Sequence, residues 1–325
     1  MKLFFFGTSS GKPTRSRNVA GAALSFANRS GWYLIDCGEG TQQQILRSPY
    51  SLHDLRAVFI THVHGDHCFG LPGLLGSAAL GNRRAPLSII APRSLRELIE
   101  VSLRCTHLNL SFRWEFQDVE GRELVFKDHG VEVTRHVLSH RVPSYAYRFV
   151  EQGMKKRLDV SELVRRLVPR GPLWGRLQEG EDVRLENGET VRSGEVTLEK
   201  WPRRRVVMAG DNDSPGLLRE ACAEADLLVH EATFTEALRR SLPSDFGHCS
   251  AAEVARFAEA INLPNLVLTH FSARFRESGG ARFPLSQLFE DARRYYGGNL
   301  LLARDLTGYR LGCDGILRQE MESSP

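Results

Sequence analysis

The chain has 325 residues, of which 42% are hydrophobic and 25% are charged, as is ordinary for a globular protein with a sizeable core. No apolar run approaches the roughly 20 residues that a membrane span needs, so we expect no membrane-embedded part. The formal net charge of +4 permits a polyanionic partner but does not indicate one by itself. The six cysteines form no C-x-x-C pair, which argues against a thiolate zinc site or a disulfide framework and favours a reducing, cytoplasmic setting.

The expected secondary structure alternates between strands and helices. Residues 2–6 predict the first strand, because this apolar run stops at Gly7 and is too short for the apolar region of a signal peptide. Apolar, β-rich runs predict further strands at residues 21–26, 32–35, 57–61, 87–90, 131–138, 145–150, 205–208, 227–229 and 266–269. Helical patterns lie at residues 40–47, 94–104, 214–225, 251–260 and 284–296. Ser250 and Glu253 form a capping-box pattern at the start of the helix expected at 251–260.

One stretch, from about residue 151 to 200, has fewer apolar runs and more charge than the rest of the chain. Seven basic and two acidic residues lie between 155 and 176, whereas two basic and seven acidic residues lie between 179 and 199. Prolines and a glycine interrupt its middle at residues 169–172, and Asn187-Gly188 predicts a hairpin turn. The stretch is either a solvated surface excursion or a protruding arm that contacts a charged partner.

Four potential metal ligands, His62, His64, Asp66 and His67, follow the strand expected at 57–61. Imidazole and carboxylate groups are typical ligands of zinc. His62 and His64 are two residues apart, so on an extended segment they point to the same side. The glycine that follows lets the chain turn and direct Asp66 and His67 towards a second ion. A single histidine is more often structural, but four such residues at one strand end indicate a metal site.

Three further candidates, His140, Asp211 and His270, lie just beyond other expected strands, where α/β sheets place their sites. Taken alone, Asp211 could cap the helix expected at 214–225, and His270 could be a core histidine. As a set they complete two coordination spheres. The first ion would be held by His62, His64 and His140, the second by Asp66, His67 and His270, and Asp211 would bridge the two. Paired ions suit the hydrolysis of phosphodiesters or other ester-like substrates.

The H-x-H-x-D-H motif resembles that of the metallo-β-lactamase superfamily, which contains many kinds of hydrolases and nucleases. Four further segments resemble ribonuclease Z, the endonuclease that matures tRNA 3′ ends. These segments are the N-terminal loop at 7–18, the H-E-A-T segment at 230–233, the G-H-C-S segment at 247–250 and the T-H-F-S-A-R-F segment at 269–275. The segment at 171–183 is similar to the arm of the bacterial short form. Asn212 and Cys249 stand where that family commonly has threonine and serine.

The resemblance implies a single metallo-β-lactamase-type catalytic domain over residues 1–325, built as a four-layer αββα sandwich, with an inserted substrate-binding arm at about 151–200. It implies two Zn²⁺ ions per subunit, although Mn²⁺ or Mg²⁺ could support activity. It also implies a cytoplasmic homodimer that acts on precursor tRNA. The expected products are a tRNA with a 3′-hydroxyl and a trailer with a 5′-phosphate.

The resemblance further implies roles for individual residues. Asp66 would ligate the second ion and orient the nucleophile, and His248, held by Glu231, would protonate the leaving ribose oxygen. His248 could instead be an ordinary histidine at a helix start. The candidate substrate contacts are Ser272, Arg274, Arg15, Arg17, Asn18, Lys155, Lys156, Arg157 and Arg176. The alternative for Arg15 and Arg17 is a solvated loop.

Two other functional classes remain open from the sequence. The first is a small-molecule ester, thioester or phosphodiester hydrolase on the same scaffold, which would need neither the arm nor the Glu231–His248 pair. The second is a non-catalytic, metal-stabilised RNA-binding protein, for which a filled set of seven ligand positions is not expected. The remaining histidines have no comparable context and are expected to be ordinary or structural: His53, His107, His129, His136 and His230.

Overall fold

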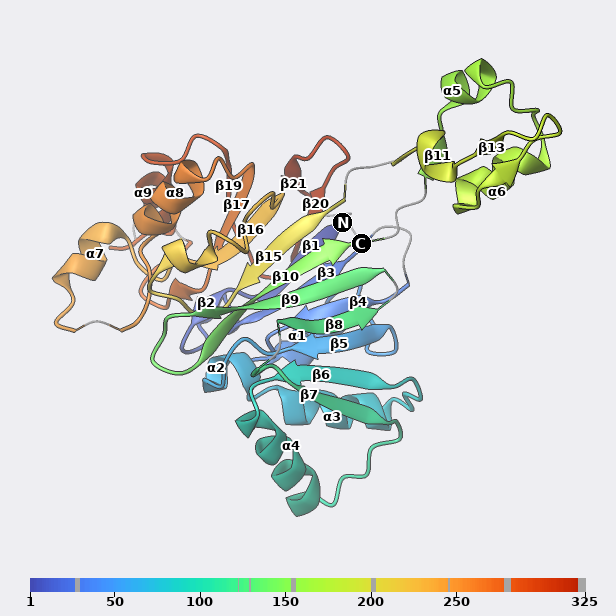
Figure 1. The fold of residues 1–325 in the computed structure, drawn as a ribbon. Coiled ribbons are helices and arrows are strands. Elements are labelled where there is room, and N and C mark those ends of the chain that lie inside the picture. Colours follow the sequence, from blue (N-terminus) through green and yellow to red (C-terminus); the bar gives the residue numbers. More distant parts are fainter. Residues whose placement is uncertain are drawn as a thin grey trace. The chain divides into compact units, whose positions relative to one another are not determined.

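The computed structural model describes residues 1–26, 30–121, 123–128, 130–152, 156–199, 203–244, 246–277 and 282–320. The chain divides into two compact units, of which the larger comprises Met1–Val150 with Arg204–Pro325, and the smaller comprises Glu151–Arg203. Figure 1 shows the elements of both units. Among the helices that the structure describes, none is long and apolar enough to cross a membrane.

Two sheets carry most of the strands of the larger unit (Figure 1). The eight-stranded sheet has the order β21 (Leu317–Gln319), β20 (Thr307–Leu311), β1 (Lys2–Gly7), β3 (Gly21–Ser25), β4 (Trp32–Ile35), β5 (Leu55–Phe59), β6 (Leu87–Ala91) and β7 (Trp114–Asp118). The seven-stranded sheet has the order β19 (Asn299–Leu302), β17 (Asn265–Thr269), β16 (Leu227–Glu231), β15 (Arg205–Ala209), β10 (Ser144–Glu151), β9 (Val131–Leu138) and β8 (Leu124–Asp128). The short strands β2 (Ser9–Ser10) and β18 (Phe271–Ser272) pair with each other in parallel.

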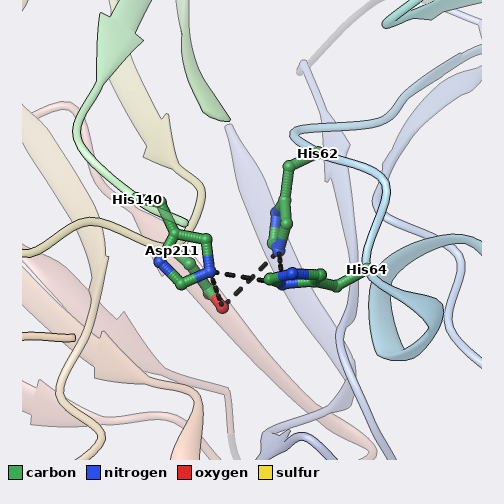
Figure 2. Close-up of side chains that lie close together, drawn as sticks. All are labelled: His62, His64, His140 and Asp211. Atoms are coloured by element: carbon green, nitrogen blue, oxygen red, sulfur yellow. Dashed lines mark hydrogen bonds and ion pairs between the residues drawn. The ribbon is translucent and has the colours of Figure 1, made fainter. Parts of the chain in front are cut away.

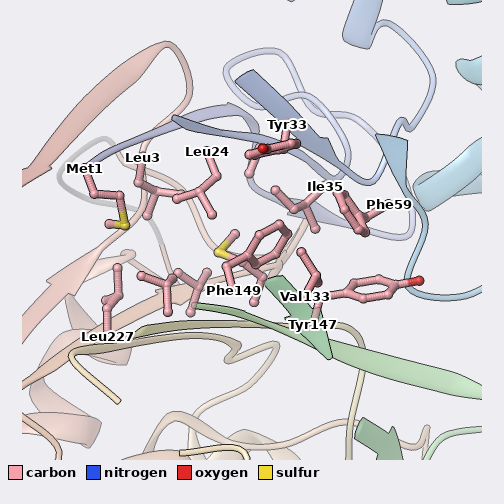
Figure 3. Packing of buried hydrophobic residues seen from close by; sticks show 14 of the residues in the cluster. Met1, Leu3, Leu24, Tyr33, Ile35, Phe59, Val133, Tyr147, Phe149 and Leu227 are labelled. Carbon is pink, nitrogen blue, oxygen red and sulfur yellow. The ribbon is translucent and has the colours of Figure 1, made fainter. Parts of the chain in front are cut away.

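The core lies between the two sheets, because alternate side chains of each strand point to opposite faces. In β1, Leu3 is buried in the cluster between the sheets, whereas Phe4 is buried in the cluster under the helices of the other face. Figure 3 shows side chains of both sheets meeting in this inner layer. The rings of Phe59 from β5 and Phe149 from β10 lie 5.0 Å apart between centroids at an angle of 74°, an edge-to-face contact.

Helices cover the outer face of each sheet. The eight-stranded sheet is covered by α1 (Thr41–Leu46), α2 (Gly65–Cys68), α3 (Leu71–Leu80) and α4 (Ser94–Cys105), which share a buried cluster with it. The seven-stranded sheet is covered by α8 (Ala251–Ala260) and α9 (Ser286–Arg293), next to the short helix α7 (Glu236–Ser241). The order of helix, sheet, sheet and helix confirms the expected four-layer αββα sandwich.

Three helices show where sequence patterns succeed and fail. The helix expected at 251–260 is confirmed as α8, with the capping box of Ser250 and Glu253 formed in both directions. The helix expected at 214–225 is wrong, since only the 3-10 turn η2 (Pro215–Leu218) forms there. Glu224 has a φ of 58°, which no α-helix accommodates, and turns bury the apolar residues instead. The helix α3 was not expected, because it is apolar almost all round and lacks an amphipathic period.

The smaller unit has a core of its own, which consists of Leu163, Val168, Leu177, Val183, Leu185, Val191 and Val196. Its elements are β11 (Lys156–Leu158), α5 (Val160–Arg165), α6 (Pro172–Glu179), β12 (Val183–Arg184), β13 (Thr190–Val191), the 3-10 turn η1 (Ser193–Glu195) and β14 (Thr197–Glu199). The strands β12 and β13 pair around the expected turn, where Gly188 has a φ of 87°. The hairpin expected at Asn187-Gly188 is therefore confirmed.

Candidate metal centre and active site

The seven candidate metal ligands lie in loops that follow four strands. The loop after β5 and the helix α2 carry His62, His64, Asp66 and His67. His140 follows β9, Asp211 follows β15 and His270 follows β17. The fold thus brings together side chains that are far apart in sequence, such as Asp66 and His270, which are 204 residues apart and lie 3.3 Å from each other.

Three histidine nitrogens meet beside one carboxylate in the first group of ligands (Figure 2). Nδ1 of His64 lies 3.1 Å from Nε2 of His62 and 3.2 Å from Nε2 of His140. Oδ2 of Asp211 lies 3.6 Å from the His62 nitrogen and 3.8 Å from the His140 nitrogen. All four donor atoms lie within 4.8 Å of one another, so one cation could contact all of them.

The second group consists of Asp66, His67 and His270, and Asp211 reaches it with its other oxygen. Nε2 of His67 lies 3.2 Å from Nε2 of His270, and both nitrogens lie within 3.5 Å of Oδ2 of Asp66. Oδ1 of Asp211 lies 3.5 Å from the His67 nitrogen and 3.4 Å from the His270 nitrogen. The two oxygens of Asp211 therefore face different groups, which is the arrangement that a bridging carboxylate requires.

The outer ring nitrogens of these histidines have oxygen partners that fix the rings. Nδ1 of His140 lies 2.7 Å from the carbonyl oxygen of Gly247, which can only accept, so Nε2 keeps its lone pair for the cluster. Nδ1 of His67 lies 2.8 Å from Oδ2 of Asp36. The further pairs are His62 with Thr61 Oγ1 at 3.1 Å and His270 with Thr233 Oγ1 at 3.2 Å. This pattern is typical of metal-binding histidines, so the residues present fit a metal site.

The electrostatics of the cluster also favour a cation. Burial alone would raise the pKa of Asp211, but His270 and His67 hold it well below its usual range. Burial lowers the pKa values of His62 and His64, which keeps both rings neutral. Burial would also lower the pKa of His67, but the surrounding carboxylates, Asp211 foremost, raise it well above its usual value. Neutral imidazoles beside ionised carboxylates are the state that binds a metal, so His67 would release its proton on metal binding.

His248 and Glu231 form an ion pair beside the ligands. Nδ1 of His248 lies 2.8 Å from Oε1 of the buried Glu231, and the same oxygen accepts from the backbone N–H of Asn212 at 3.0 Å. The hydroxyl of Thr233 donates to the other carboxylate oxygen. Burial would lower the pKa of His248, but Glu231 raises it to about 9, so the ring carries a proton at neutral pH. A positively charged proton donor therefore stands next to the cluster.

Asp36 is a site residue that the sequence analysis missed. It directly follows the buried strand β4 and accepts hydrogen bonds from the backbone N–H of Thr61 at 2.8 Å and from its hydroxyl at 2.9 Å. It also holds the ring of His67. The signal was present, because a carboxylate just beyond an apolar strand is the same pattern that located other ligands. His230, by contrast, is fully buried between Asn212 and a backbone carbonyl, in keeping with a structural residue.

The N-terminal loop, residues 8–18, is fixed against the site. The backbone N–H of Gly11 donates to Oδ2 of Asp66 at 2.7 Å. Arg17 is only 3% exposed, and its guanidinium donates to the carbonyl oxygens of Phe275 at 2.9 Å and Ser272 at 3.1 Å. The structure thus corrects the expectation of a surface contact: Arg17 ties the loop to the segment after His270 and can influence substrate only through that loop.

The other expected substrate contacts near the site differ in accessibility. Arg15 and Arg274 are exposed, and neither forms an ion pair with another residue that the structure describes. Ser272 is buried, and its hydroxyl accepts from the backbone N–H of Arg274 at 3.4 Å. The backbone N–H of Asn18 donates to the carboxylate of Asp305 at 2.6 Å. Arg15 and Arg274 are therefore the two expected contacts near the site whose charged groups are presented to solvent.

The expected contacts in the smaller unit fall into three cases. Lys155 lies outside the described residues. Arg157 is exposed and Lys156 is partly exposed, and neither forms an ion pair within the described part of the chain. Arg176 is engaged with Glu181 at 2.8 Å. The basic half of this unit is therefore partly neutralised by its own acidic residues.

Comparisons with known proteins agree with this geometry. The chain is 46% identical over 314 residues to a ribonuclease Z from Marinobacter nauticus, with 97% of each chain covered. It is 47% identical over 317 residues to a ribonuclease Z from Pseudomonas putida, with 98% of each covered. A ribonuclease Z from Brevibacillus brevis is 37% identical over 298 residues, covering 91% of this chain and 92% of that protein.

Solved structures and a family description extend the comparison. Human tRNase Z, short form, aligns with a TM-score of 0.65 at 25% identity, covering 96% of this chain and all of that one. The metallo-β-lactamase fold protein YhfI from Bacillus subtilis aligns with a TM-score of 0.62 at 17% identity, covering 98% and 99% of the two chains, and supports the fold alone. The family described as Anti-Pycsar protein Apyc1 matches residues 1–152. The extent and identity of the curated relatives show that this chain belongs to the ribonuclease Z family, with a metallo-β-lactamase fold.

Proposed function

We propose that this protein is a metal-dependent endoribonuclease that removes the 3′ trailer from tRNA precursors, leaving a 3′-hydroxyl on the tRNA and a 5′-phosphate on the trailer. The observation that carries the proposal is the His248–Glu231 ion pair beside two ligand groups that share Asp211, in a chain that matches ribonuclease Z over nearly its whole length. A proton donor next to two groups of metal ligands suits the hydrolysis of a phosphodiester with a poor leaving group, because a ribose oxygen needs a proton to leave.

The donor set favours two Zn²⁺ ions, with Mn²⁺ or Mg²⁺ as possible substitutes. His62, His64 and His140 would hold one ion and Asp66, His67 and His270 the other, with Asp211 between them. When bound, the ions would polarise the phosphate and make a hydroxide available near neutral pH. The outer ring nitrogens of four of these histidines already have oxygen partners. The rings therefore need to move little when the metals bind.

Side chains of the protein would orient the attacking oxygen, protonate the leaving oxygen and bind neighbouring phosphates. Asp66 lies within hydrogen-bond reach of the site and is fixed by Gly11, so it can orient the attacking oxygen. Attack at phosphorus breaks the bond to the ribose 3′-oxygen, which leaves with the bonding electrons and needs a proton. His248 supplies that proton, and Glu231 keeps the imidazolium charged and turned towards the reaction. Arg274 and Arg15 are exposed near the site and would bind neighbouring phosphates.

We assign the catalytic role to one metallo-β-lactamase-type domain, and a tRNA grip to the smaller unit, Glu151–Arg203, inserted in it as an arm. Within the arm, Arg166 pairs with both Glu162 and Glu195, so it is a weaker candidate for phosphate. Arg157 has no described ion-pair partner, and Arg170 lies over the ring of Trp174 at 5.5 Å. These two arginines can contact the tRNA backbone without breaking an ion pair within the arm.

We also propose a homodimer in a reducing cytoplasm. Three large apolar side chains are strongly exposed. Leu46 lies in α1, Phe69 directly follows α2, and Leu80 lies in α3. Exposed groups of this kind on neighbouring elements are typical of contact surfaces between subunits. The six cysteines are all free, as a reducing compartment would maintain them. Light scattering on the intact chain, compared with Phe69→Asp and Leu80→Asp variants, tests the dimer.

One incubation tests the proposed reaction. A 3′-extended tRNA precursor is treated with the enzyme, with and without chelator, and the product ends are sequenced. Cleavage after the last encoded nucleotide of the tRNA, with a 3′-hydroxyl, is expected without chelator and should stop with it. A panel of small esters and thioesters runs in parallel. Turnover of that panel without cleavage of the precursor would instead favour a small-molecule hydrolase on the same scaffold.

A further inference from the structure

A hollow lies beside the groups of candidate metal ligands, and His248 forms part of its wall. It has a volume of about 330 Å³, at the lower end of the range of small-ligand pockets. Its wall consists of Phe234, Glu236, Arg239, Arg240, Leu242, Ser244, Phe246, His248, Ser250 and Glu253. Most of these residues come from the chain between Glu231 and His248, the two partners of the ion pair.

The hollow is lined by aromatic rings and by arginine side chains that pair with glutamates. Phe246 is 37% exposed, and its ring centroid lies 6.5 Å from that of the buried Phe234, which in turn lies 6.2 Å from the ring of His248. The two arginines are held in place by carboxylates, Arg239 by Glu253 and Arg240 by Glu236. A planar ring with polar edges suits such a wall, since it can stack on an aromatic face while its edges meet polar groups.

The helix α7, which carries both arginines, is anchored by polar contacts. None of its residues is fully buried. Its first N–H donates to Asp291 at 2.8 Å, and Glu236 accepts from Arg256 at 2.9 and 3.1 Å. Three charged or polar links therefore hold one wall of the hollow to α8 and α9, so the hollow is built by specific contacts and is not a gap left by poor packing.

The chemistry of the reaction says which part of a substrate would reach this hollow. His248 gives its proton to the ribose 3′-oxygen that leaves phosphorus, so that ribose lies next to His248. The base on the same ribose is then the nearest planar group of the substrate to the hollow. The attacking oxygen approaches phosphorus opposite the leaving 3′-oxygen, and the trailer keeps the phosphate through its own 5′-oxygen.

We propose that this hollow binds the base of the last tRNA nucleotide, the one that keeps the 3′-oxygen, and that Phe246 is its exposed stacking face. The proposal rests on the reaction assigned above and deepens it by naming a base-binding subsite. Phe246 contacts substrate without entering the chemical step. The subsite places the leaving oxygen at His248, so it contributes to the choice of the cleavage position.

A double-mutant cycle between enzyme and substrate tests the subsite. Two precursors are compared that differ only at the last tRNA nucleotide, which carries a base in one and is abasic in the other. For the unaltered enzyme, kcat/KM should fall about tenfold or more on the abasic precursor, as expected for loss of one stacked base. Phe246→Ala should show a similar fall on the precursor with the base and no further fall on the abasic one. Phe246→Trp should restore most of the activity.

The matched control is Phe289→Ala, because Phe289 in α9 is equally exposed, at 36%, and does not line the hollow. It should leave the cleavage of both precursors and the hydrolysis of bis(p-nitrophenyl) phosphate unaffected. Equal losses on both precursors in Phe246→Ala, or coupling to the first trailer nucleotide instead, would overturn the subsite. In either case correct cleavage by the unaltered enzyme would leave the assigned reaction standing, whereas its absence would remove the reaction itself.

Discussion

Nδ1 of His248 and Oε1 of Glu231 lie 2.8 Å apart, although 17 residues separate them in the chain. The carboxylate is buried and held in place by Asn212 and Thr233, so its charge is directed at the imidazole. The contact keeps a proton on His248, whereas burial keeps the rings of the candidate ligands His62 and His64 neutral. This difference in protonation distinguishes the proposed proton donor from these two metal ligands.

Replacing His248 with alanine should lower kcat on a tRNA precursor by about 10²- to 10⁴-fold, because the ribose oxygen would leave without a general acid. Metal content, measured by plasma mass spectrometry, should stay the same, since the ligand donor atoms do not include this ring in the proposed spheres. The loss should be much smaller on bis(p-nitrophenyl) phosphate, whose leaving group needs no proton. An equal loss on both substrates would show that His248 acts in metal binding or folding instead.

Glu231→Gln should shift the alkaline limb of the pH profile of kcat to lower pH. The pKa of His248 is raised from 6.5 to about 9, and as pH rises through that value the acid loses its proton. Removing the carboxylate charge leaves burial, which lowers the pKa, so the proton is lost at lower pH. We expect a shift of about one pH unit or more. A limb that stays in place would mean that another group sets it.

His64→Ala and His140→Ala should each reduce the metal content from the two zinc ions per chain that we propose towards one, because both rings belong to the same ligand group. His53→Ala is the matched control, since His53 is exposed and has no place in the cluster. Stripping the metals with chelator should lower the melting temperature, because a ligand that binds only the folded state stabilises it by mass action. Retention of two ions in the His64 variant would contradict the proposed division of ligands.

The sequence predicted ten strands of the two main sheets and the grouping of the candidate ligands, for one physical reason, but it missed β7, β8, β19, β20 and β21. Apolar strands followed by polar residues are local patterns, and the parallel strands β15, β16 and β17 bring their carboxyl ends to one edge. Asp211 and His270 could be found in this way without a structure. Asp36 obeys the same rule, since it follows the strand β4, but was overlooked because no other candidate ligand stands beside it in the sequence.

The sequence could not distinguish Arg15 from Arg17, because composition says nothing about which of two neighbouring cations turns inward. Burial of Arg17 depends on the carbonyl oxygens of Phe275 and Ser272, which lie more than 250 residues away. For a similar reason, the charge of the arm could not tell which of its cations form ion pairs within the arm. Local ion pairs, such as that of Arg176 with Glu181, form only once the chain folds on itself.

The contrast between Arg17 and Arg15 gives a last prediction. Arg17→Ala would leave two carbonyl oxygens without their buried donor, at a cost of about 1–3 kcal/mol of unfolding free energy, which thermal denaturation can measure. It should also release the loop that places the Gly11 N–H on Asp66, so kcat should fall on tRNA precursors and on small phosphodiesters alike. Arg15→Ala removes an exposed side chain, so stability should change by less than about 0.5 kcal/mol and only KM for the precursor should rise. A loss of stability in Arg15→Ala would contradict the role of Arg15 as an exposed substrate contact. A rise in KM alone in Arg17→Ala would contradict the structural role of Arg17, because this residue would then contact the substrate directly.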